Sequence, residues 1–493
     1  MVFPIVGGNQ STGDIVTSSL RFNNDDSNYL EKSLSSPNTD KFTVSFWSKI
    51  SGQRANVFSL GKRLVGATGD YFSFDVDLGT GTGSGRLSVG GYNGNSDSNT
   101  LAVNTVEGSG NVMRDVSAWQ HHVFAIDTGQ GTAGNRFKWY INGVLQSGYN
   151  TTTTPSQNVD LFDSSGSAFR IGRLHNDESR YMDGYLAEFY YVDGQQYDPT
   201  YFGETSDDGV WVPVEKDKGA GGAITFGTNG FYLQFKQTGT SANASGMGAD
   251  TSGNDNHLTP SNLAADHVTT DTPQNNFCTL NPNASQGGSN QSSGVATFTE
   301  GNLVVDNVSS ESITSTFGVN SGKWYWEVKV LTDQDGLAIG AINDHFHLDA
   351  EIGYNSPSSP SEAKVFAYYG GNGNKYTTIG DGSQLSSYGS AIAVNNIIGV
   401  ALNLDDDEVV FYLNGTAQNS GTAFSITALG DEENYFPAIG NWSASAVKLS
   451  FNFGNPVFSI SSGNSDGAGY GNFEYAVPSG YYSLCTKNIA EYG

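Results

Sequence analysis

Apolar and polar side chains alternate along many short stretches of this chain, and this alternation constrains the fold more than any other feature. Residues 323–330 (KWYWEVKV) place two tryptophans and two valines at every second position. Residues 42–50 (FTVSFWSKI) show a similar pattern. Successive side chains of a β-strand point to opposite faces, so this spacing predicts strands with two distinct faces. We find no long stretch with the spacing of an amphipathic helix.

Turn residues and composition support the same fold class. The pairs Asn142-Gly143 and Asn414-Gly415 each follow an alternating stretch. Asn and Gly tolerate the positive φ angles of a type I′ turn best, so both pairs predict β-hairpins. The 63 glycines favour many tight turns, and the 12% aromatic residues are enough to fill hydrophobic cores. We therefore predict an all-β protein built from two antiparallel jelly-roll β-sandwiches.

The sandwiches are expected on either side of a Gly/Asn/Ser-rich connector. Much of the connector is small and polar, as in ADTSGNDNHLT, and its few aromatic residues suggest that it packs on its neighbours. The five expected segments are an N-terminal arm (1–14), a first sandwich (15–204), the connector (205–293), a second sandwich (294–486) and a C-terminal tail (487–493).

The charge of the chain excludes several classes of partner. The formal net charge is −27. Nucleic acid needs a basic footprint, so we expect no nucleic-acid partner. An anionic membrane surface is disfavoured for the same reason, and no apolar run is long enough for membrane insertion.

The chain has two cysteines, Cys278 and Cys485, and no C-x-x-C pair. This excludes a disulfide-stapled scaffold and a zinc module. Because the two residues bracket the second sandwich, and the ends of a domain often approach each other, we expect them to lie close in space and to stay reduced.

The first sandwich contains four strings that are informative together: LRFNNDDSNYLEKSLSSPNTDKFTVSFWSKI, WQHHVFAID, WYINGVLQ and YMDGYLAEFYYVDG. They resemble laminin-G-type, concanavalin-A-like domains, and the connector string ADTSGNDNH resembles an acidic, Gly-rich stretch of such domains. The second sandwich contains the strings SGKWYWEVKV, LAIGAIND, IIGVALNLDDDEVVFYLNG, YFPAIG and VKLSFNFG. These five strings resemble SPRY (B30.2-like) domains.

Together with the flanking strings DTPQNNFCTLNPN and VPSGYYSLCTKNI, the chain resembles virion structural proteins of marine tailed bacteriophages. The resemblance implies a virion location after synthesis in the bacterial cytoplasm, and a role on the particle surface. The first hypothesis is a tail-associated adhesin, or receptor-binding protein, that recognises a host surface glycan or protein. The alternative is a capsid or tail decoration protein that binds mainly other virion proteins. For either role we expect a homo-oligomer on the particle.

A glycan-degrading enzyme is the third hypothesis, because concanavalin-A-like folds also host glycosidases. A retaining glycosidase needs two carboxyl groups about 5–5.5 Å apart, which an E-x-D-x-E strand would supply. The chain has no such run; Asp75 and Asp77 are spaced i, i+2, but no glutamate is near them in the sequence. It also has no G-x-S-x-G or P-loop pattern. We therefore expect no enzymatic activity.

Three loops combine aromatic residues with asparagine, as sugar-binding sites do. Aromatic faces stack on sugar rings, and amides bind hydroxyl groups. The other interpretation is that the loops are turns with packed aromatic residues. The candidate ligand-binding residues are Tyr92, Asn93, Asn95, Tyr368, Tyr369, Asn372, Asn374 and Trp442.

Calcium is the cofactor that the acidic composition favours, because Ca²⁺ takes six to eight oxygen ligands. The laminin-G resemblance implies one such site on a sheet rim. Asp75, Asp77 and Asp183 are the candidate ligands, although none matches a motif tightly. The other interpretation is a set of solvated acidic turns.

A structural calcium predicts that chelation destabilises the protein. A ligand that binds only the folded state raises its stability, so excess EDTA is expected to lower the melting temperature and added Ca²⁺ to restore it. A thermal unfolding curve that is identical with and without EDTA would show that this chain holds no structural calcium.

Overall fold

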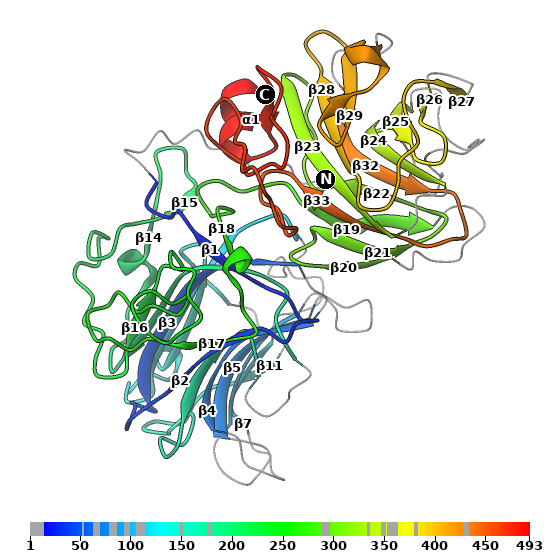
Figure 1. Cartoon of the computed structure of the whole chain (residues 1–493). Helices are drawn as coiled ribbons and strands as arrows, with labels where there is room; N and C mark the ends of the chain where they lie inside the picture. Colours follow the sequence, from blue (N-terminus) through cyan, green and yellow to red (C-terminus); the bar gives the residue numbers. More distant parts are fainter. Residues whose placement is uncertain are drawn as a thin grey trace. The chain divides into compact units, whose positions relative to one another are not determined.

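The computed structural model describes residues 14–51, 54–62, 70–77, 86–92, 99–104, 115–147, 151–174, 180–287, 296–332, 336–346, 352, 363–378, 383–426 and 433–493. The chain is 45% strand and 5% helix, which confirms the predicted all-β class. It divides into two compact units, one ending at Gln274 and the other beginning at Asn275 (Figure 1). Among the described residues, no helix has the length and apolar character needed to span a bilayer.

The first unit contains two large antiparallel sheets and one two-stranded sheet. Its strands are β1 (Ser19–Phe22), β2 (Tyr29–Ser33), β3 (Lys41–Ile50), β4 (Arg54–Lys62), β5 (Asp70–Asp77), β6 (Arg86–Tyr92), β7 (Asn99–Asn104), β8 (Gln120–Asp127), β9 (Phe137–Ile141), β10 (Val144–Leu145), β11 (Thr151–Thr153), β12 (Ala168–Ile171), β13 (Gly184–Asp193), β14 (Gly203–Thr205), β15 (Trp211–Pro213), β16 (Phe231–Leu233), β17 (Thr259–Ser261) and β18 (Val268–Thr269), with short 3₁₀ turns at Ala133–Asn135, Pro199–Tyr201 and Ala265–His267. One sheet has the order β10-β9-β8-β3-β13-β1-β18, with β16 also paired to β13. The other has the order β11-β7-β6-β5-β4-β12-β2-β17.

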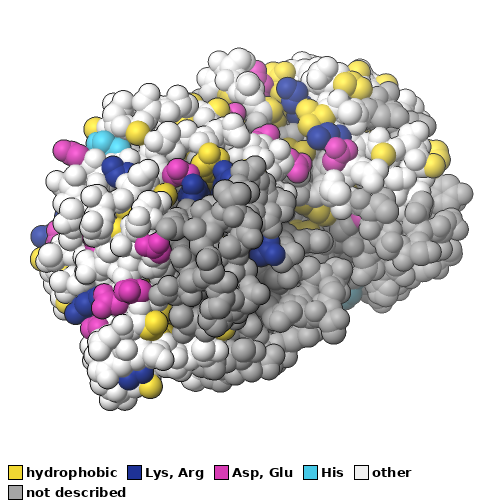
Figure 2. Space-filling view, turned by 90° about the horizontal axis from the view of Figure 1, so that it is seen from below, with side chains coloured by type: hydrophobic (Ala, Val, Ile, Leu, Met, Phe, Trp, Pro, Cys, Tyr) yellow, Lys and Arg dark blue, Asp and Glu magenta, His cyan; other side chains and the backbone are white. Residues whose placement is uncertain are grey.

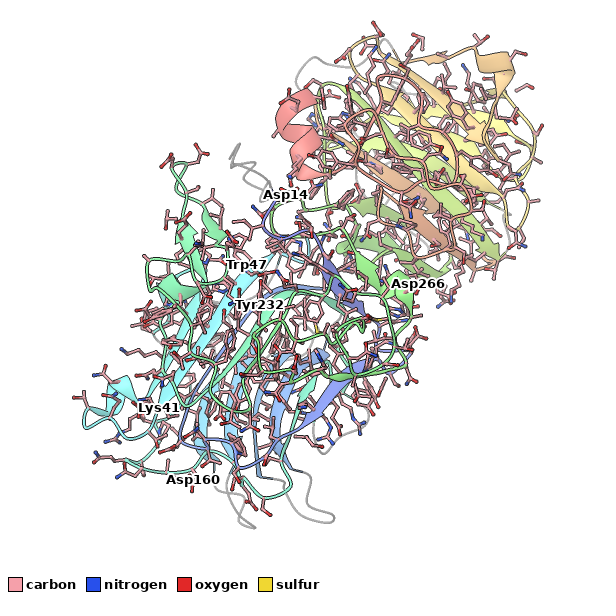
Figure 3. All side chains as sticks on the ribbon, turned by 60° about the vertical axis from the view of Figure 1, so that its left-hand side comes forward. Asp14, Lys41, Trp47, Asp160, Tyr232 and Asp266 are labelled. Carbon is pink, nitrogen blue, oxygen red and sulfur yellow. The ribbon has the colours of Figure 1, made fainter. Side chains whose placement is uncertain are left out.

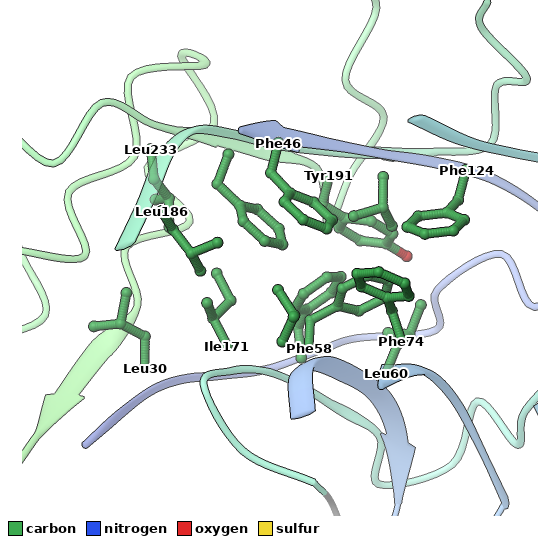
Figure 4. Packing of buried hydrophobic residues seen from close by; sticks show 14 of the residues in the cluster. Leu30, Phe46, Phe58, Leu60, Phe74, Phe124, Ile171, Leu186, Tyr191 and Leu233 are labelled. Carbon is green, nitrogen blue, oxygen red and sulfur yellow. The ribbon is translucent and has the colours of Figure 1, made fainter. Parts of the chain in front are cut away.

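Aromatic side chains from both large sheets fill the core between them (Figure 4). Phe46 of β3 lies 5.8 Å from the ring of Phe58 on β4 and 5.1 Å from that of Phe189 on β13. The period-two pattern of β3 places Phe42 and Phe46 in this core and leaves Trp47 on the outer face. Burying each such side chain stabilises the fold by roughly 1.5–3 kcal/mol.

The two Asn-Gly pairs form the predicted hairpin turns. Asn142 and Gly143 have φ angles of 47° and 77°, and they join β9 to β10. Positive φ at both central positions is the signature of a type I′ turn. Gly143 is also required by packing, because a Cβ there would lie 2.5 Å from the ring of Trp211. Asn414 repeats the arrangement in the second unit.

The stretch expected as a connector extends the first sandwich as far as Gln274. Strand β16 pairs with β13, β17 with β2 and β18 with β1, so the boundary between the units lies at 274/275, inside the range 205–293 that was expected as a connector. Strand β16 alternates over only three residues within a polar stretch, so the sequence pattern did not assign it to the sandwich. Phe231 and Leu233 enter the core, whereas Tyr232 faces outward. Figure 3 labels Tyr232 together with Trp47 of β3, which belongs to the same sheet.

A polar loop after β16 is ordered by one carboxylate. Asp250 accepts hydrogen bonds from the backbone N–H groups of Tyr232, Ser252 and Asn256 at 2.8–2.9 Å. These bonds satisfy backbone groups that a packed core would otherwise leave unpaired. Its Gly/Asn/Ser-rich composition therefore reflects tight turns within a folded segment.

The second unit is also a sandwich. Its strands are β19 (Leu280–Gly287), β20 (Thr297–Thr299), β21 (Val304–Val308), β22 (Glu311–Ser315), β23 (Lys323–Thr332), β24 (Leu337–Asn343), β25 (Val365–Tyr369), β26 (Asn374–Thr378), β27 (Ser383–Ser387), β28 (Ile397–Asn403), β29 (Glu408–Leu413), β30 (Thr416–Ala417), β31 (Phe424–Ser425), β32 (Tyr435–Asn441), β33 (Val447–Asn452) and β34 (Tyr482–Ser483), with a 3₁₀ turn at Asn419–Gly421 and helix α1 at Thr486–Tyr492. One sheet has the order β19-β22-β32-β24-β25-β26-β27. The other has the order β20-β21-β33-β23-β28-β29-β30, with β31 on β29 and β34 parallel to β23.

Strand β23 shows the predicted alternation, but both of its faces are covered. Trp324 and Trp326 lie in the core between the sheets. On the other face Glu327 is fully buried and accepts hydrogen bonds from the backbone N–H groups of Glu474 at 3.0 Å and Tyr475 at 2.8 Å. The chain after β33 therefore packs on the outer face of this sheet, held by a carboxylate that the sequence pattern alone would place in solvent.

The C-terminal residues form a short helix and pair with the first residues of the second unit. Residues 487–493, expected as a tail, lie mostly in α1. The segments that carry the two cysteines are paired, since Cys485 bridges Phe277 and the N–H of Cys278 donates to the Leu484 carbonyl at 2.9 Å. Directly opposite residues of an antiparallel pair point to the same face, so the side chain of Cys485 lies on the same face as that of Phe277. Cys278 follows Phe277 in the chain, so its side chain points to the opposite face. Both cysteines are buried.

A buried ion pair ties the end of the first unit to β3. Lys49 Nζ lies 2.9 Å from Asp271 Oδ2, and the two side chains are 1% and 0% exposed. Trp119 Nε1 donates to the other carboxylate oxygen at 2.9 Å. A buried ion pair is stable only when its charges are paired and hydrogen-bonded, as they are here.

A second buried acid lies on β13. Glu188 adopts φ 48° where the register shifts between Ala187 and Tyr190. Its Oε2 accepts hydrogen bonds from the hydroxyls of Tyr190 and Tyr232, and its buried Oε1 has no partner among the described residues. Burial raises the pKa of Glu188 to about 7. The hydrogen bond from Tyr232 favours the carboxylate and therefore acts in the opposite direction, but its effect is smaller.

Breaking the buried ion pair is expected to destabilise the first unit strongly. Lys49→Met leaves the Asp271 carboxylate buried without its cation, which costs about 3–5 kcal/mol in the free energy of unfolding. The double variant Lys49→Met/Asp271→Leu removes both charges and is expected to recover most of that loss. Urea denaturation of the parent and the variants measures both effects. A single variant as stable as the parent contradicts the prediction.

Glu188 is expected to make stability depend on pH. The unfolded chain loses this proton near pH 4.5, whereas the folded chain keeps it to about pH 7. Glu188 therefore favours folding most at low pH, and the contribution is lost as pH rises through that window. Glu188→Gln lacks this titration. The difference in unfolding free energy between the variant and the parent is therefore expected to rise by about 3 kcal/mol, in favour of the variant, as the pH increases from about 4.5 to 7.5.

The measurement compares the two proteins at each pH, because other groups titrate as well. Burial holds the pKa of His121 and of His122 at about 3, so both histidines destabilise the folded state as pH falls below about 6.5. That loss is common to parent and variant and cancels in their difference. A difference in unfolding free energy that does not change with pH would contradict the assignment.

Candidate ligand-binding loops

Two loops at one end of a sheet in the second unit bring Tyr369 and Trp442 together. Tyr369 ends β25, and Trp442 follows β32; both strands pair with β24. Trp442 Nε1 donates a hydrogen bond to the Tyr369 hydroxyl at 2.9 Å. The two residues are 73 positions apart in the sequence, so only the shared neighbour β24 places them side by side.

The two aromatic rings lie in nearly parallel planes. Their planes differ by 15° and their centroids are 6.3 Å apart. The hydrogen bond joins the indole N–H at one ring edge to the phenol oxygen at the other. Near-parallel rings joined through their edges lie next to each other rather than face to face. Trp442 is half-buried and Tyr369 is 8% exposed, so Trp442 supplies most of the accessible area.

The backbone around Trp442 is held by the strands beneath it. The N–H of Trp442 donates to the Gly336 carbonyl at 3.2 Å. The buried amide of Asn441 donates to the carbonyls of Val308 at 2.8 Å and Ser445 at 2.7 Å. Gly336 has φ 78°, and a Cβ there would lie 2.6 Å from Ser443 atoms. Sequence reasoning missed the role of Gly336, whose only signal is a glycine directly before a β-strand.

The loop after Tyr369 is a tight polar turn. The N–H of Gly373 donates to the Tyr369 carbonyl at 3.0 Å, and the N–H of Asn374 donates to Asn372 Oδ1 at 3.0 Å. Asn372 is exposed and Asn374 is half-buried. The Nδ2 of Asn372 has no hydrogen-bond partner within the described ranges. Asn372 and Asn374 thus lie in the turn that follows Tyr369, and their role in ligand binding stays a prediction.

Tyr368 is not a binding residue, and its prediction is corrected. Its side chain is fully buried in the core of the second unit, where its ring stacks on Phe411 with centroids 5.5 Å apart. Its hydroxyl donates to the Ser390 carbonyl. Adjacent residues of a strand face opposite ways, so Tyr368 points into the core while Tyr369 points out of it.

The loop predicted in the first unit stays untested. Tyr92 is the last residue of β6, opposite Asn99 of β7. Asn93 and Asn95 lie outside the described residues.

The three calcium candidates are not seen to converge. Asp75 on β5 accepts hydrogen bonds from Asn56 Nδ2 at 2.9 Å and Ser73 Oγ at 3.0 Å. Asp183 precedes β13, in the other sheet, and accepts the N–H of Asn24 at 2.8 Å. Asp77 ends β5. Over the described ranges, no three His, Cys, Asp or Glu side chains are arranged to hold a metal ion. Calcium binding stays a prediction for the chelation experiment.

A Ser–His pair in the first unit cannot act as a nucleophile and base. Ser45 Oγ lies 2.9 Å from His121 Nε2, which has the spacing of a catalytic dyad. However, Trp211 Nε1 donates to His121 Nδ1 at 2.9 Å. An indole N–H is only a donor, so the imidazole proton sits on Nε2 and is donated to Ser45. Both residues are buried, and burial, with a smaller effect of His122, lowers the pKa of His121 to about 3.

Each unit matches a known domain family. Residues 22–196 match the concanavalin A-like lectin/glucanases superfamily, and residues 323–456 match the SPRY domain family. The first range lies in the first unit and the second range in the second unit. These matches agree with the two resemblances that the sequence strings indicated.

Similar individual proteins share only part of the chain. A stretch of 151 residues is 30% identical to the ATP-dependent RNA helicase Ddx1 of Drosophila melanogaster, covering 30% of this chain and 18% of the helicase. The SPRY domain of human HERC1 is 14% identical with a TM-score of 0.27, covering 35% of this chain and 96% of that one. A heptameric SAP-like pentraxin from Limulus polyphemus is 16% identical with a TM-score of 0.29, covering 44% and 91% respectively. The chain thus carries a concanavalin A-like domain followed by a SPRY domain.

Proposed function

We propose that this protein is a non-catalytic recognition protein of a bacteriophage particle, a tail-associated adhesin whose second unit binds a host surface glycan or protein through the loops of Tyr369 and Trp442. The observation that carries the binding site is the hydrogen-bonded aromatic pair at the end of the β24 sheet. The virion location rests on the resemblance of the whole sequence. Domains of the two matched kinds generally serve in binding, which supports a role without catalysis.

The aromatic pair suits a ligand with a flat apolar face. An indole ring offers a large contact area and loses little conformational entropy on binding. The bond to Tyr369 holds the Trp442 ring in one orientation, so part of the ordering cost is met before a ligand arrives. Tyr369 is therefore a positioning residue, and Trp442 is the residue expected to touch the ligand.

The local charge favours a neutral ligand. The strings YGGNGN (369–374) and GNWSASA (440–446) contain no charged residue, although the chain carries a net charge of −27. Charged side chains of both signs lie interspersed on the face shown in Figure 2, where no large acidic patch appears among the coloured residues. A neutral sugar offers an apolar ring face for Trp442 and hydroxyl groups for the Asn372 amide.

We expect the substitution Trp442→Ala to abolish most binding. Loss of a central aromatic contact weakens binding by at least about tenfold. Tyr369→Phe keeps the ring but removes the hydroxyl that accepts the indole N–H, so a smaller loss is expected. The measurement is binding of the full chain to a neutral-glycan array and to host cells.

Phe458→Ala is the matched control, because Phe458 is a half-buried aromatic residue of the same unit outside both loops. It is expected to bind like the parent. Circular dichroism of each variant establishes that loss of binding is not loss of folding. If folded Trp442→Ala binds as well as the parent, the site is wrong. If the parent binds no glycan or cell but binds other virion proteins, the decoration role replaces the adhesin.

A further inference from the structure

One open sheet edge of the second unit lacks the features that usually protect such edges. An edge strand exposes unpaired N–H and C=O groups, and proteins guard it with short strands, proline, bulges or charges. The four large sheets end in eight strands. Six of these are two or three residues long in the described part of the chain, and β19 is interrupted by Pro282 and a register shift.

The eighth edge strand, β27, has none of these protections. It spans five residues, SQLSS, without proline or charge. All five pair with β26 in one unbroken register. Its central residue, Leu385, is 53% exposed and is one of the few large hydrophobic side chains that the described surface displays. No other strand pairs with β27 on its far side among the described residues.

The charge around β27 favours a second copy of this chain as the occupant. Two copies with a net charge of −27 each repel one another over most of their surfaces. Strand β27 has no charged residue, and neither do residues 388–394 that follow it. The paired strand β26 carries one charged residue, the basic Lys375, opposite Ser386. An edge strand without acidic residues is where two such acidic chains can approach with the least repulsion.

We propose that two copies of this chain pair through β27 in an antiparallel arrangement around a two-fold axis at Leu385. A two-fold contact must be self-complementary. With Leu385 at the centre of the strand, it lies opposite Leu385 of the second copy, and residue 383 lies opposite residue 387. The contact consumes the open edge of both copies, so it produces a closed dimer and no fibre.

The interface is small, so the dimer is expected to be weak and concentration-dependent. Five residues on each side place it below about 1,200 Å², the size of transient contacts. The inference does not depend on the glycan site, because β27 is neither of the two binding loops.

Analytical ultracentrifugation of the full chain tests the dimer. The parent, at 52.3 kDa, is expected to reach twice that mass as its concentration rises to about 100 µM. Leu385→Lys places two like charges opposite each other and is expected to stay monomeric. Leu145→Lys is the matched control, since Leu145 is also an exposed leucine, at 52%, on an edge strand, and it should dimerise like the parent.

Disulfide trapping tests the register. Opposite residues of an antiparallel pair have Cα atoms about 4.5–5.5 Å apart, within disulfide range. Under mild oxidation Leu385→Cys is expected to form a covalent dimer, and Ser387→Cys, opposite residue 383, is not. The native cysteines are buried and do not compete. A parent that stays monomeric at all concentrations, a Leu385→Lys variant that still dimerises, or equal trapping of both cysteine variants overturns the proposal.

Discussion

The fold depends on covering both faces of the central strands. All ten residues of β13 are buried, and most of β23 is buried as well. Core packing covers one face of each strand. The other face is covered by chain that follows the sandwich strands, residues 195–235 in the first unit and residues after β33 in the second. A two-layer sandwich with one solvated face per sheet would not need these segments.

Buried acidic groups fasten these covering segments in place. Glu327 on β23 accepts backbone N–H groups of the C-terminal segment, and Glu188 on β13 accepts the hydroxyl of Tyr232. For Asp271 the acid lies on the later segment instead of the covered strand, and it pairs with Lys49 on β3. Removing a charge from water is costly, so each group contributes only while its partners are correctly positioned. These contacts join each covering segment to a strand of the sheet that it covers.

The loops of each sandwich are supported by packed strands and can change in sequence without disturbing the core. The aromatic pair of Tyr369 and Trp442 is built on β25 and β32, whose shared neighbour β24 belongs to a packed sheet. A ligand site on such a support is ordered without help from the ligand. The open edge of β27 lies in the same sheet but is separated from β24 by β25 and β26. The proposed ligand loops and the proposed dimer edge are therefore different elements of one unit, although Asn374 of β26 pairs with Ser387 of β27.

The sequence by itself determined the strands, their faces and the hairpin turns. Alternation is local, so it correctly assigned Trp324 and Trp326 to one face of β23, and Asn142-Gly143 identified its own turn. It also indicated both domain families and the aromatic loops. Tertiary structure alone decided that residues 205–274 belong to the first unit, that Tyr368 is a core residue and that Trp442 meets Tyr369. The physical reason is that these outcomes depend on contacts between residues far apart in the chain, whereas periodicity reports only which neighbours share a face.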